Sequence, residues 1–280
     1  MYWYDGRLIH SDTIELPVAE PGLLYGATVF TTLRVWQQSL EHPLSFWDAH
    51  CTRLHQSICC LGWAEPDWEH VDQGANHLAL HYPVLRVTVF PDGREWITGR
   101  SLPSNLHQWQ QEGIKAWVAP KEWRRSLPHY KTGNYLACWL ALQTAQQMGY
   151  QEAILVDSHN NWLETSTGSL WGWYDNCWWT PSLTDPLDDN SERILPGVAR
   201  SHLISALKWH NRQVQESVWS MDLVSRFEAL FYTNSVRYVV AIAHVHQPIH
   251  PQKYEKGLAL NYPVNHAGLQ GILDLFCSIP

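Results

Sequence analysis

The spacing of apolar positions predicts alternating helices and strands in the first hundred residues. Apolar side chains recur at helical intervals over 46–61 and, more weakly, over 68–80. Short apolar runs on either side of Asp5-Gly6 and of Pro91-Asp92-Gly93 predict two β-hairpins, because these are common turn sequences. Strands are expected at 3–9, 29–36, 84–90 and 95–98. The pattern predicts a small α/β domain over residues 1–105.

A polar stretch separates this region from a longer one with the same mixture of patterns. Residues 101–113 are rich in Gln, Ser and Asn, so a linker is expected at 106–113. A second, larger α/β domain with a mixed sheet is expected over 114–280. Its predicted helices are 135–148, 197–209 and 266–277, and its predicted strands are 114–118, 153–156, 170–174, 178–180, 214–218, 229–233 and 239–245.

Composition limits the classes of function. Of the 280 residues, 45% are hydrophobic and 16% are charged, which excludes wholesale disorder. The net charge of −8, without any block of like charges, argues against a nucleic-acid interface. No apolar run approaches the roughly 20 residues that span a bilayer, and the N-terminus does not resemble a secretory signal. The six cysteines lack a C-x-x-C pair, as is typical of reduced thiols, so we expect a cytoplasmic globular protein.

Two unusual residue counts have ordinary explanations. The 17 tryptophans are scattered through the chain, and large aromatic side chains mostly fill cores and interfaces. Among the 16 histidines, His244 and His246 would point to one side of a strand, but no further ligand follows at a familiar spacing. We therefore expect neither a carbohydrate site nor a metal site.

Two ionisable residues are candidates for chemistry. Lys131 precedes Thr132-Gly133-Asn134-Tyr135 at the start of an apolar helix pattern, where a lysine can act as an amine nucleophile. An exposed loop lysine is the alternative interpretation. Glu164 lies in a polar break between two apolar strands, as an ordinary turn residue or as the partner of a protonated ring nitrogen.

Three further segments could bind an anion. Pro196-Gly197 begins a helix, whose first backbone N–H groups can hold a phosphate. The Arg53 guanidinium suits a pair of phosphate oxygens, and Thr233-Asn234-Ser235 offers hydroxyl and amide groups at a strand end. A surface arginine and common polar turns are the alternatives for each segment taken alone.

Taken together and in order, these segments resemble a known family. The set comprises Gly22-Leu23-Leu24-Tyr25-Gly26 followed by Val29-Phe30 and Arg34, His50-x-x-Arg53-Leu54, Lys131-Thr132-Gly133-Asn134-Tyr135-Leu136, Glu164, Leu195-Pro196-Gly197-Val198 and Thr233-Asn234-Ser235. It is similar to the motifs of the class IV pyridoxal-phosphate enzymes, which include branched-chain aminotransferases, D-amino-acid aminotransferases and aminodeoxychorismate lyases. The resemblance runs from about residue 3 to about residue 245.

The resemblance implies a fold-type-IV enzyme of two α/β domains, usually a homodimer, with pyridoxal 5'-phosphate between the domains. Lys131 would bond to the cofactor and carry the proton, and Glu164 would pair with the pyridine nitrogen. Tyr135 would hydrogen-bond the ring's phenolic oxygen. The implied phosphate ligands are Arg53, the amides of Val198 and Ala199, and the Ser235 hydroxyl.

Within the family, Thr31-Thr32 and Ala199 favour an aminodeoxychorismate lyase that forms 4-aminobenzoate and pyruvate, with Thr32 as a proton donor. Branched-chain aminotransferases usually have Glu-Gly at 31–32 and Thr at 199. A branched-chain or D-amino-acid aminotransferase is the alternative, and a non-enzymatic Trp-rich binding protein is a third reading. The segment 90–96 departs from the family pattern, and Arg86 and Arg94 are the candidates to bind substrate carboxylates.

Overall fold

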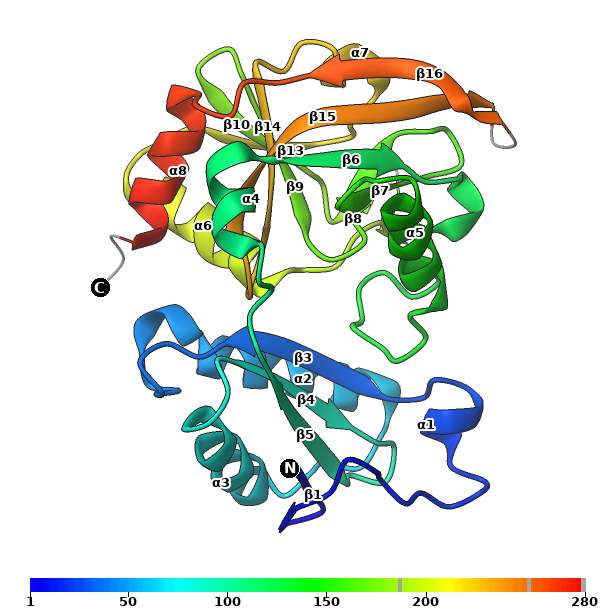
Figure 1. Ribbon diagram of the computed structural model, residues 1–280, viewed down its shortest axis with the longest axis vertical. Coiled ribbons are helices and arrows are strands. Elements are labelled where there is room, and N and C mark those ends of the chain that lie inside the picture. The colour runs from blue at the N-terminus through cyan, green and yellow to red at the C-terminus, as the bar shows by residue number, and fades with distance from the viewer. Residues whose placement is uncertain (186–187, 251–252, 278–280) are drawn as a thin grey trace. The chain divides into compact units, whose positions relative to one another are not determined.

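A computed structural model describes residues 1–185, 188–250 and 253–277 (Figure 1). The chain forms two compact units. Unit 1 comprises Met1–Pro103 and Tyr130–Tyr135, and unit 2 comprises Ser104–His129 and Leu136–Pro280. Both units combine a β-sheet with helices, so the expected mixed α/β fold class is confirmed.

In its described residues, unit 1 contains a five-stranded antiparallel sheet in the order β2-β1-β5-β4-β3. The strands are β1 (Tyr2–Tyr4), β2 (Arg7–Ile9), β3 (Val29–Arg34), β4 (Val84–Val89) and β5 (Glu95–Arg100), and the helices are α1 (Pro21–Leu24), η1 (Pro43–Ser45), α2 (Trp47–Leu61) and α3 (Trp68–Ala79). The core contains Leu54 and Ile58 of α2 and Val71 and Leu78 of α3, with Leu33 of β3. The predicted helical periodicity therefore positions α2 and α3 on the sheet.

Within the described residues, unit 2 contains a nine-stranded mixed sheet in the order β13-β10-β9-β14-β15-β6-β7-β8, with β16 paired to β15. Its strands are β6 (Ile114–Val118), β7 (Glu152–Val156), β8 (Trp162–Thr165), β9 (Ser169–Tyr174), β10 (Cys177–Pro181), β13 (Val214–Ser217), β14 (Ala229–Asn234), β15 (Tyr238–His250) and β16 (Lys253–Asn261), and a separate hairpin pairs β11 (Thr184–Asp185) with β12 (Asp188–Glu192). Its helices are α4 (Leu106–Glu112), η2 (Lys121–Trp123), α5 (Leu136–Gln147), α6 (Val198–Trp209), α7 (Met221–Val224) and α8 (Ala267–Cys277).

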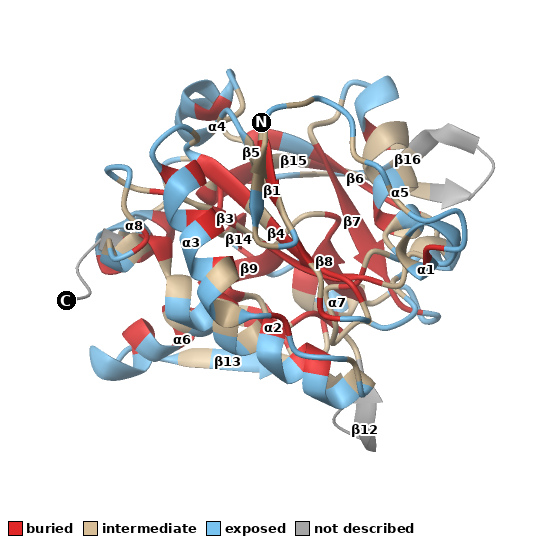
Figure 2. Ribbon diagram, turned by 90° about the horizontal axis from the view of Figure 1, so that it is seen from below, coloured by how far each residue is buried: buried red, intermediate tan, exposed pale blue. Residues whose placement is uncertain are grey.

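Burial follows the strands in both units. Figure 2 shows buried residues along the sheet strands and exposed positions on the outer sides of the helices. Trp117, Trp162, Trp171 and Trp219 are among the largest fully buried side chains, which agrees with a mainly structural use of tryptophan. Trp139 and Trp209 are exceptions, because both are exposed.

Two local predictions are wrong. The expected linker at 106–113 forms helix α4, because Leu106 is buried and Trp109 packs against the core of unit 2. The expected polar break around Glu164 is strand β8, in which every residue is buried. In both places a few large apolar side chains outweigh the polar composition around them.

The cysteines that the structure describes, Cys51, Cys59, Cys60, Cys138 and Cys177, are free thiols. The side chain of Cys277 lies outside the described residues. No helix in the described part of the chain combines the length and the apolar character that crossing a membrane requires.

Candidate active site

Lys131 lies in an extended segment beside the start of β3. Its carbonyl accepts a hydrogen bond from the amide of Phe30 at 2.8 Å. Two residues later, the Gly133 amide donates to the carbonyl of Thr28 at 2.7 Å. The backbone at Lys131 is therefore positioned by the sheet of unit 1.

Glycines in two of the predicted motifs permit this close approach. Gly26 has a φ of +66°, and a Cβ added there would lie 2.9 Å from the backbone nitrogen of Asn134. A Cβ added at Gly133 would lie 2.3 Å from Thr28 Oγ1 and 2.8 Å from the Gly26 carbonyl oxygen. Since these distances are shorter than van der Waals contact, the motif around Gly26 and the motif around Lys131 need both glycines to pack together.

The Lys131 amine lies against aromatic rings on one face of β3. Its Nζ is 4.8 Å from the centroid of the Phe30 ring and 5.5 Å from that of Tyr135. The two rings meet edge to face, with their centroids 5.7 Å apart. Because side chains alternate along a strand, Thr32 shares the face of Phe30, whereas Thr31 points to the opposite face.

Arg53 of α2 is held from that opposite face. Its Nη2 donates to Thr31 Oγ1 at 2.7 Å, and the same oxygen lies 2.5 Å from Nδ1 of His50. Thr31 and His50 are fully buried. The predicted phosphate ligand is thus attached to a buried polar pair, of which the sequence motif contains only His50.

Arg86 of β4 shares the neighbourhood of Phe30 and Thr32. It pairs with Thr32 across the sheet, and its guanidinium carbon is 3.6 Å from the centroid of the Phe30 ring. Its Nε donates to Thr88 Oγ1 at 3.3 Å. Burial lowers the pKa of Arg86 to about 10. Among the described residues, no carboxylate forms a salt bridge with Arg86, so its charge can serve an anionic ligand.

Arg94 is already committed to protein carboxylates. Its Nη2 is 2.5 Å from Glu20 Oε2, its Nε is 2.7 Å from Asp92 Oδ2, and it also donates to the hydroxyl of Tyr4. Burial alone would lower the pKa of Arg94, but the hydrogen bonds to Glu20 and Asp92 raise it. Of the two arginines expected to bind substrate carboxylates, only Arg86 has a charge that no carboxylate of the described residues neutralises.

In unit 2, Glu164 is a buried carboxylate with a cationic neighbour. It pairs with Leu155 of β7, and its exposed fraction is 5%. The Nε of Arg125 lies 3.8 Å from Glu164 Oε1, and both side chains are almost completely buried. The two side chains form a buried ion pair, and a carboxylate is a group that can pair with a protonated ring nitrogen.

The predicted helix terminus is present at α6. Gly197 is the N-cap, and Val198 and Ala199 are the first two helical residues. Because its N-cap residue is a glycine, this helix has no side-chain cap from that position. The first amides of an α-helix have no partner within the helix, and the helix dipole adds partial positive charge there. This end of α6 is therefore suited to bind an anion.

Ser235 follows β14 at the same end of the sheet. The side-chain carbonyl of Asn234 accepts hydrogen bonds from the amides of Val236 and Arg237, at 3.0 and 2.8 Å, and so shapes the turn that carries Ser235. At the end of β14, Thr233 pairs with Ser169 of β9.

Ser169 also connects this turn with α6. A Cβ added at Gly197 would lie 2.9 Å from the Ser169 hydroxyl oxygen. The start of α6 and the end of β14 therefore both lie beside Ser169, as a shared phosphate site requires.

A buried network that sequence reasoning missed supports this end of the sheet. Glu152 is fully buried and accepts hydrogen bonds from the hydroxyls of Ser166 and Thr167. Arg237 Nη1 lies 3.7 Å from Glu152 Oε2 and donates to the Tyr232 hydroxyl at 2.7 Å. The sequence does contain a signal for this network, since Glu152 directly precedes the apolar run 153–156. A carboxylate next to a buried strand is itself buried and therefore needs polar partners.

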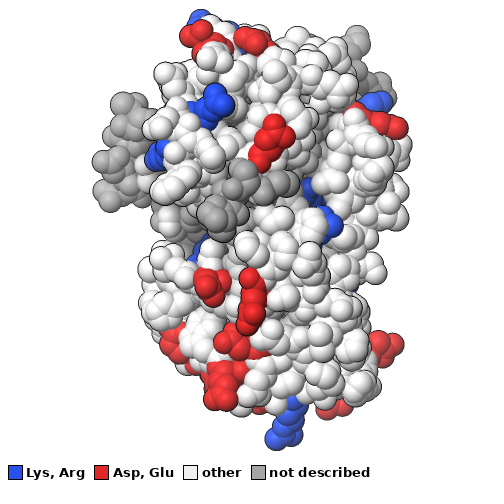
Figure 3. Space-filling model, turned by 90° about the vertical axis from the view of Figure 1, so that its left-hand side faces the viewer, with Lys and Arg blue, Asp and Glu red and all other residues white. Residues whose placement is uncertain are grey.

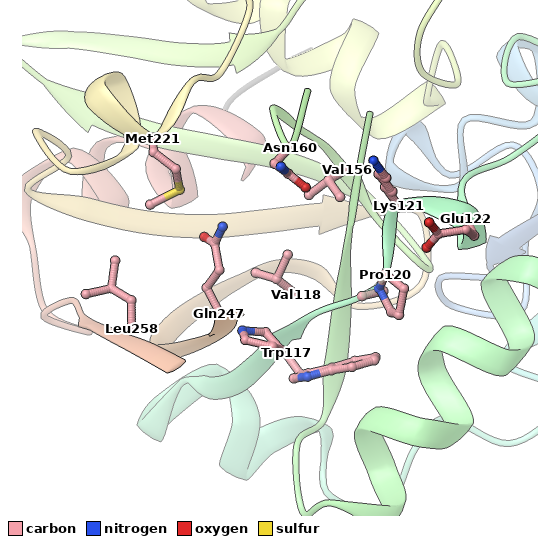
Figure 4. Close-up of a pocket in the computed structure, with 12 residues that line it drawn as sticks. Trp117, Val118, Pro120, Lys121, Glu122, Val156, Asn160, Met221, Gln247 and Leu258 are labelled. Atoms are coloured by element: carbon pink, nitrogen blue, oxygen red, sulfur yellow. The ribbon is translucent and has the colours of Figure 1, made fainter. Parts of the chain in front are cut away.

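Two other features lie outside this set of residues. A cavity of about 500 Å³ in unit 2 is lined mainly by apolar groups, with Trp117 and Leu258 at its sides and the amides of Asn160 and Gln247 directed toward it (Figure 4). None of the predicted site residues is among the described residues that line it. The lining alone does not specify a ligand.

An exposed trio in unit 1 could hold a metal ion by its geometry, since ligand atoms of His55, Cys59 and Glu65 lie within 4.8 Å of one another. Hydrogen bonds within the trio and from Trp68 already satisfy Glu65. On the face seen in Figure 3, lysines and arginines are scattered singly and form no basic patch.

Each unit, taken by itself, offers groups that suit pyridoxal phosphate. Unit 1 supplies an amine against aromatic rings at Lys131 and a guanidinium at Arg53. Unit 2 supplies the buried carboxylate of Glu164 and, near Ser235, a helix start whose N-cap is Gly197. An amine suits the cofactor's aldehyde, a carboxylate suits its ring nitrogen, and a guanidinium and a helix start suit its phosphate.

Comparison with known proteins agrees with this fit. The aminodeoxychorismate lyase of Vibrio harveyi is 22% identical over 265 residues, covering 89% of this chain and 92% of its own length. The branched-chain-amino-acid aminotransferase of Escherichia coli K12 is 22% identical over 280 residues, covering 87% and 84%. The PLP-bound form of a hypothetical aminotransferase from Mycobacterium tuberculosis has a TM-score of 0.77 at 16% identity, covering 99% of both chains.

The family model of amino-transferase class IV matches residues 28–245, a range that contains every predicted cofactor ligand. The chain therefore belongs to the class IV aminotransferases, enzymes whose cofactor is pyridoxal phosphate.

Proposed function

We propose that this enzyme is a 4-amino-4-deoxychorismate lyase, which forms 4-aminobenzoate and pyruvate. The observation that carries the proposal is the position of Thr32, which lies on the face of β3 that also presents Phe30, against whose ring the Lys131 amine lies. A hydroxyl there is suited to donate a proton close to the amine that removes one. The Vibrio harveyi relative named as an aminodeoxychorismate lyase supports the same assignment.

The reaction requires two proton transfers. Bound pyridoxal phosphate supplies an electron-accepting ring for the substrate's amine-bearing carbon. Lys131 removes the proton from that carbon, and Glu164 keeps the ring nitrogen protonated. The C–O bond to the enolpyruvyl group breaks as the substrate ring becomes aromatic. Thr32 then protonates the methylene carbon of the departing group, which leaves as pyruvate.

Arg86 is proposed to bind a substrate carboxylate. The substrate has two carboxylates, and Arg86 is a buried cation across the sheet from Thr32. Arg94 is assigned a structural role because Glu20 and Asp92 neutralise it. Val198, Ala199, Ser235 and Arg53 are proposed to hold the phosphate, and Tyr135 the phenolic oxygen, as the resemblance implies.

A homodimer is part of the proposal. Leu23, Leu24 and Tyr25, in and just after α1, have exposed fractions of 67%, 54% and 75%. Consecutive exposed apolar side chains favour a protein partner, and a second copy of this chain is the partner that the family resemblance implies. Sedimentation of the purified enzyme should give twice the chain mass. We also propose a cytoplasmic location, as expected from the cysteine pattern.

The test is to incubate the purified holoenzyme with aminodeoxychorismate in the absence of any keto acid. We expect equal amounts of pyruvate and 4-aminobenzoate. Thr32→Val should lower kcat by about a hundredfold if its hydroxyl is the acid, and Thr32→Ser should restore most of the rate. Absence of both products would refute the lyase.

A transaminase is the second candidate, because the Escherichia coli aminotransferase matches this chain at the same identity as the lyase. It predicts that an L- or D-amino acid converts the bound cofactor to its amine form, visible as loss of the absorption band, and that a keto acid restores the band. That result, without reaction on aminodeoxychorismate, would establish the transaminase instead.

A further inference from the structure

The guanidinium of Arg53 is anchored by two side chains that have no assigned role. Arg53 Nη2 donates to Thr31 Oγ1 at 2.7 Å, and Thr31 Oγ1 lies 2.5 Å from His50 Nδ1. Thr31 comes from β3, whereas His50 and Arg53 lie one helical turn apart on α2. The contact therefore joins the helix to the strand through polar atoms within an otherwise apolar core.

Counting protons fixes the direction of the first hydrogen bond in this chain. Arginine can only donate, so Thr31 Oγ1 accepts from Arg53. Thr31 Oγ1 keeps its own hydrogen and a second lone pair, so it can donate to Nδ1 of a neutral His50 or accept from it. In either tautomer the His50 ring holds the Thr31 hydroxyl that Arg53 contacts. Burial, followed by the charges of Arg53 and Lys131, holds the pKa of His50 well below its usual value, which keeps the ring neutral.

The arrangement costs stability that an apolar residue would avoid. His50 is fully buried, and its Nε2 has no hydrogen-bond partner among the described residues. A buried polar atom without a partner is unfavourable, whether it is a donor or an acceptor. What His50 adds, compared with an apolar side chain of similar size, is the ring nitrogen that hydrogen-bonds the Thr31 hydroxyl and so orients it.

We propose that Thr31 and His50 are positioning residues that fix the orientation of Arg53 for the cofactor's phosphate. The adjacent threonines then have separate tasks: Thr31 orients the phosphate ligand from the core face of β3, and Thr32 faces the substrate. The inference rests on the role of Arg53 in the proposed function, but it does not depend on whether the enzyme is a lyase or a transaminase.

The test compares binding of pyridoxal phosphate with binding of pyridoxal, which lacks the phosphate. The apoenzyme is titrated with each compound, and the visible absorption band is followed. Thr31→Val keeps the shape of the side chain and removes the hydroxyl, and Thr31→Ser restores the hydroxyl. Ser57→Ala is the matched control, because Ser57 is buried on the same helix and its hydroxyl donates to the Arg53 carbonyl, not to its guanidinium, at 2.9 Å.

Thr31→Val should raise the Kd for pyridoxal phosphate about tenfold, because a hydrogen bond to a charged group is lost. Its Kd for pyridoxal should stay unchanged. Thr31→Ser should bind both compounds within about twofold of the parent enzyme, and Ser57→Ala should do the same. His50→Phe should reproduce Thr31→Val, and the ³¹P signal of the bound phosphate should shift in both variants but not in Ser57→Ala.

Four outcomes separate the possible failures. Equal weakening of both compounds in Thr31→Val would show a purely structural role and overturn the inference, as would parent-like binding of pyridoxal phosphate. Failure of the parent enzyme itself to bind pyridoxal phosphate would refute the proposed function. Normal binding without lyase activity would refute the lyase and leave the positioning role intact.

Discussion

Replacing Arg86 and Arg94 separately by glutamine should give opposite signatures. Arg86 has no salt bridge within the described residues, whereas Arg94 contacts Glu20 and Asp92. The loss of Arg86 should therefore affect the binding of an anionic substrate. The loss of Arg94 should affect folding, because Glu20 is 1% exposed and would remain buried without its cation.

The expected magnitudes follow from these contacts. A hydrogen bond to a charged group contributes about 1.5–3 kcal/mol, so Arg86→Gln should raise the KM for aminodeoxychorismate by about 10- to 100-fold. Breaking a buried ion pair costs about 3–5 kcal/mol. The Gly22 amide still donates to Glu20 at 3.1 Å, and the Arg94 side chain is 22% exposed, which favours the lower limit. A loss of about 3 kcal/mol should lower the Tm by roughly 6–12 °C.

The assay combines steady-state kinetics with thermal unfolding of both holoenzyme variants. Arg86→Gln should retain nearly the parent Tm, and Arg94→Gln should retain the parent KM at a temperature where it is folded. The reasoning would be refuted if Arg94→Gln raised the KM while Arg86→Gln left it unchanged.

Three further predictions concern packing, the ring-nitrogen partner and pH. Gly133→Ala should lower the Tm and weaken pyridoxal-phosphate binding, because its Cβ would lie 2.3 Å from Thr28 Oγ1 and displace the Lys131 backbone. Gly62→Ala is the control, because a Cβ added there meets nothing within 4 Å. It should change the Tm through backbone strain but leave binding unchanged. Glu164→Gln should lower kcat by about a hundredfold or more while the cofactor still binds, and an unchanged kcat would contradict its role. Burial lowers the pKa of His202 to about 4, so between the unfolded value of about 6.5 and pH 4 the unfolded chain binds more protons. The stability that this group contributes is complete above pH 6.5 and falls as the pH decreases. His202→Gln should therefore make the free energy of unfolding less dependent on pH between pH 7 and pH 5. Because His202 is partly exposed, we expect this change to be roughly 1 kcal/mol or less per pH unit, measured by chemical unfolding.

The local elements that the sequence predicted best are those with strong periodicity. The helical pattern over 46–61 corresponds to α2 (Trp47–Leu61), and the hairpin around Pro91-Asp92-Gly93 joins β4 and β5. The prediction of a linker at 106–113 was wrong because two apolar residues, Leu106 and Trp109, suffice to pack α4 on unit 2. The sequence analysis missed strand β16 because its residues show no clear alternation of apolar and polar side chains, and its pairing with β15 defines it instead.

The sequence by itself determined the family, the cofactor and the faces of β3, because ordered motifs and the two-residue period of a strand are local properties. Only the tertiary structure decided what each charged side chain contacts. Arg94 is neutralised by Glu20, 74 residues away, and Arg53 is anchored by Thr31, 22 residues away. Such contacts depend on how strands and helices pack. A side chain's type therefore indicates what it can do, and its neighbours in the fold determine which of those roles it has.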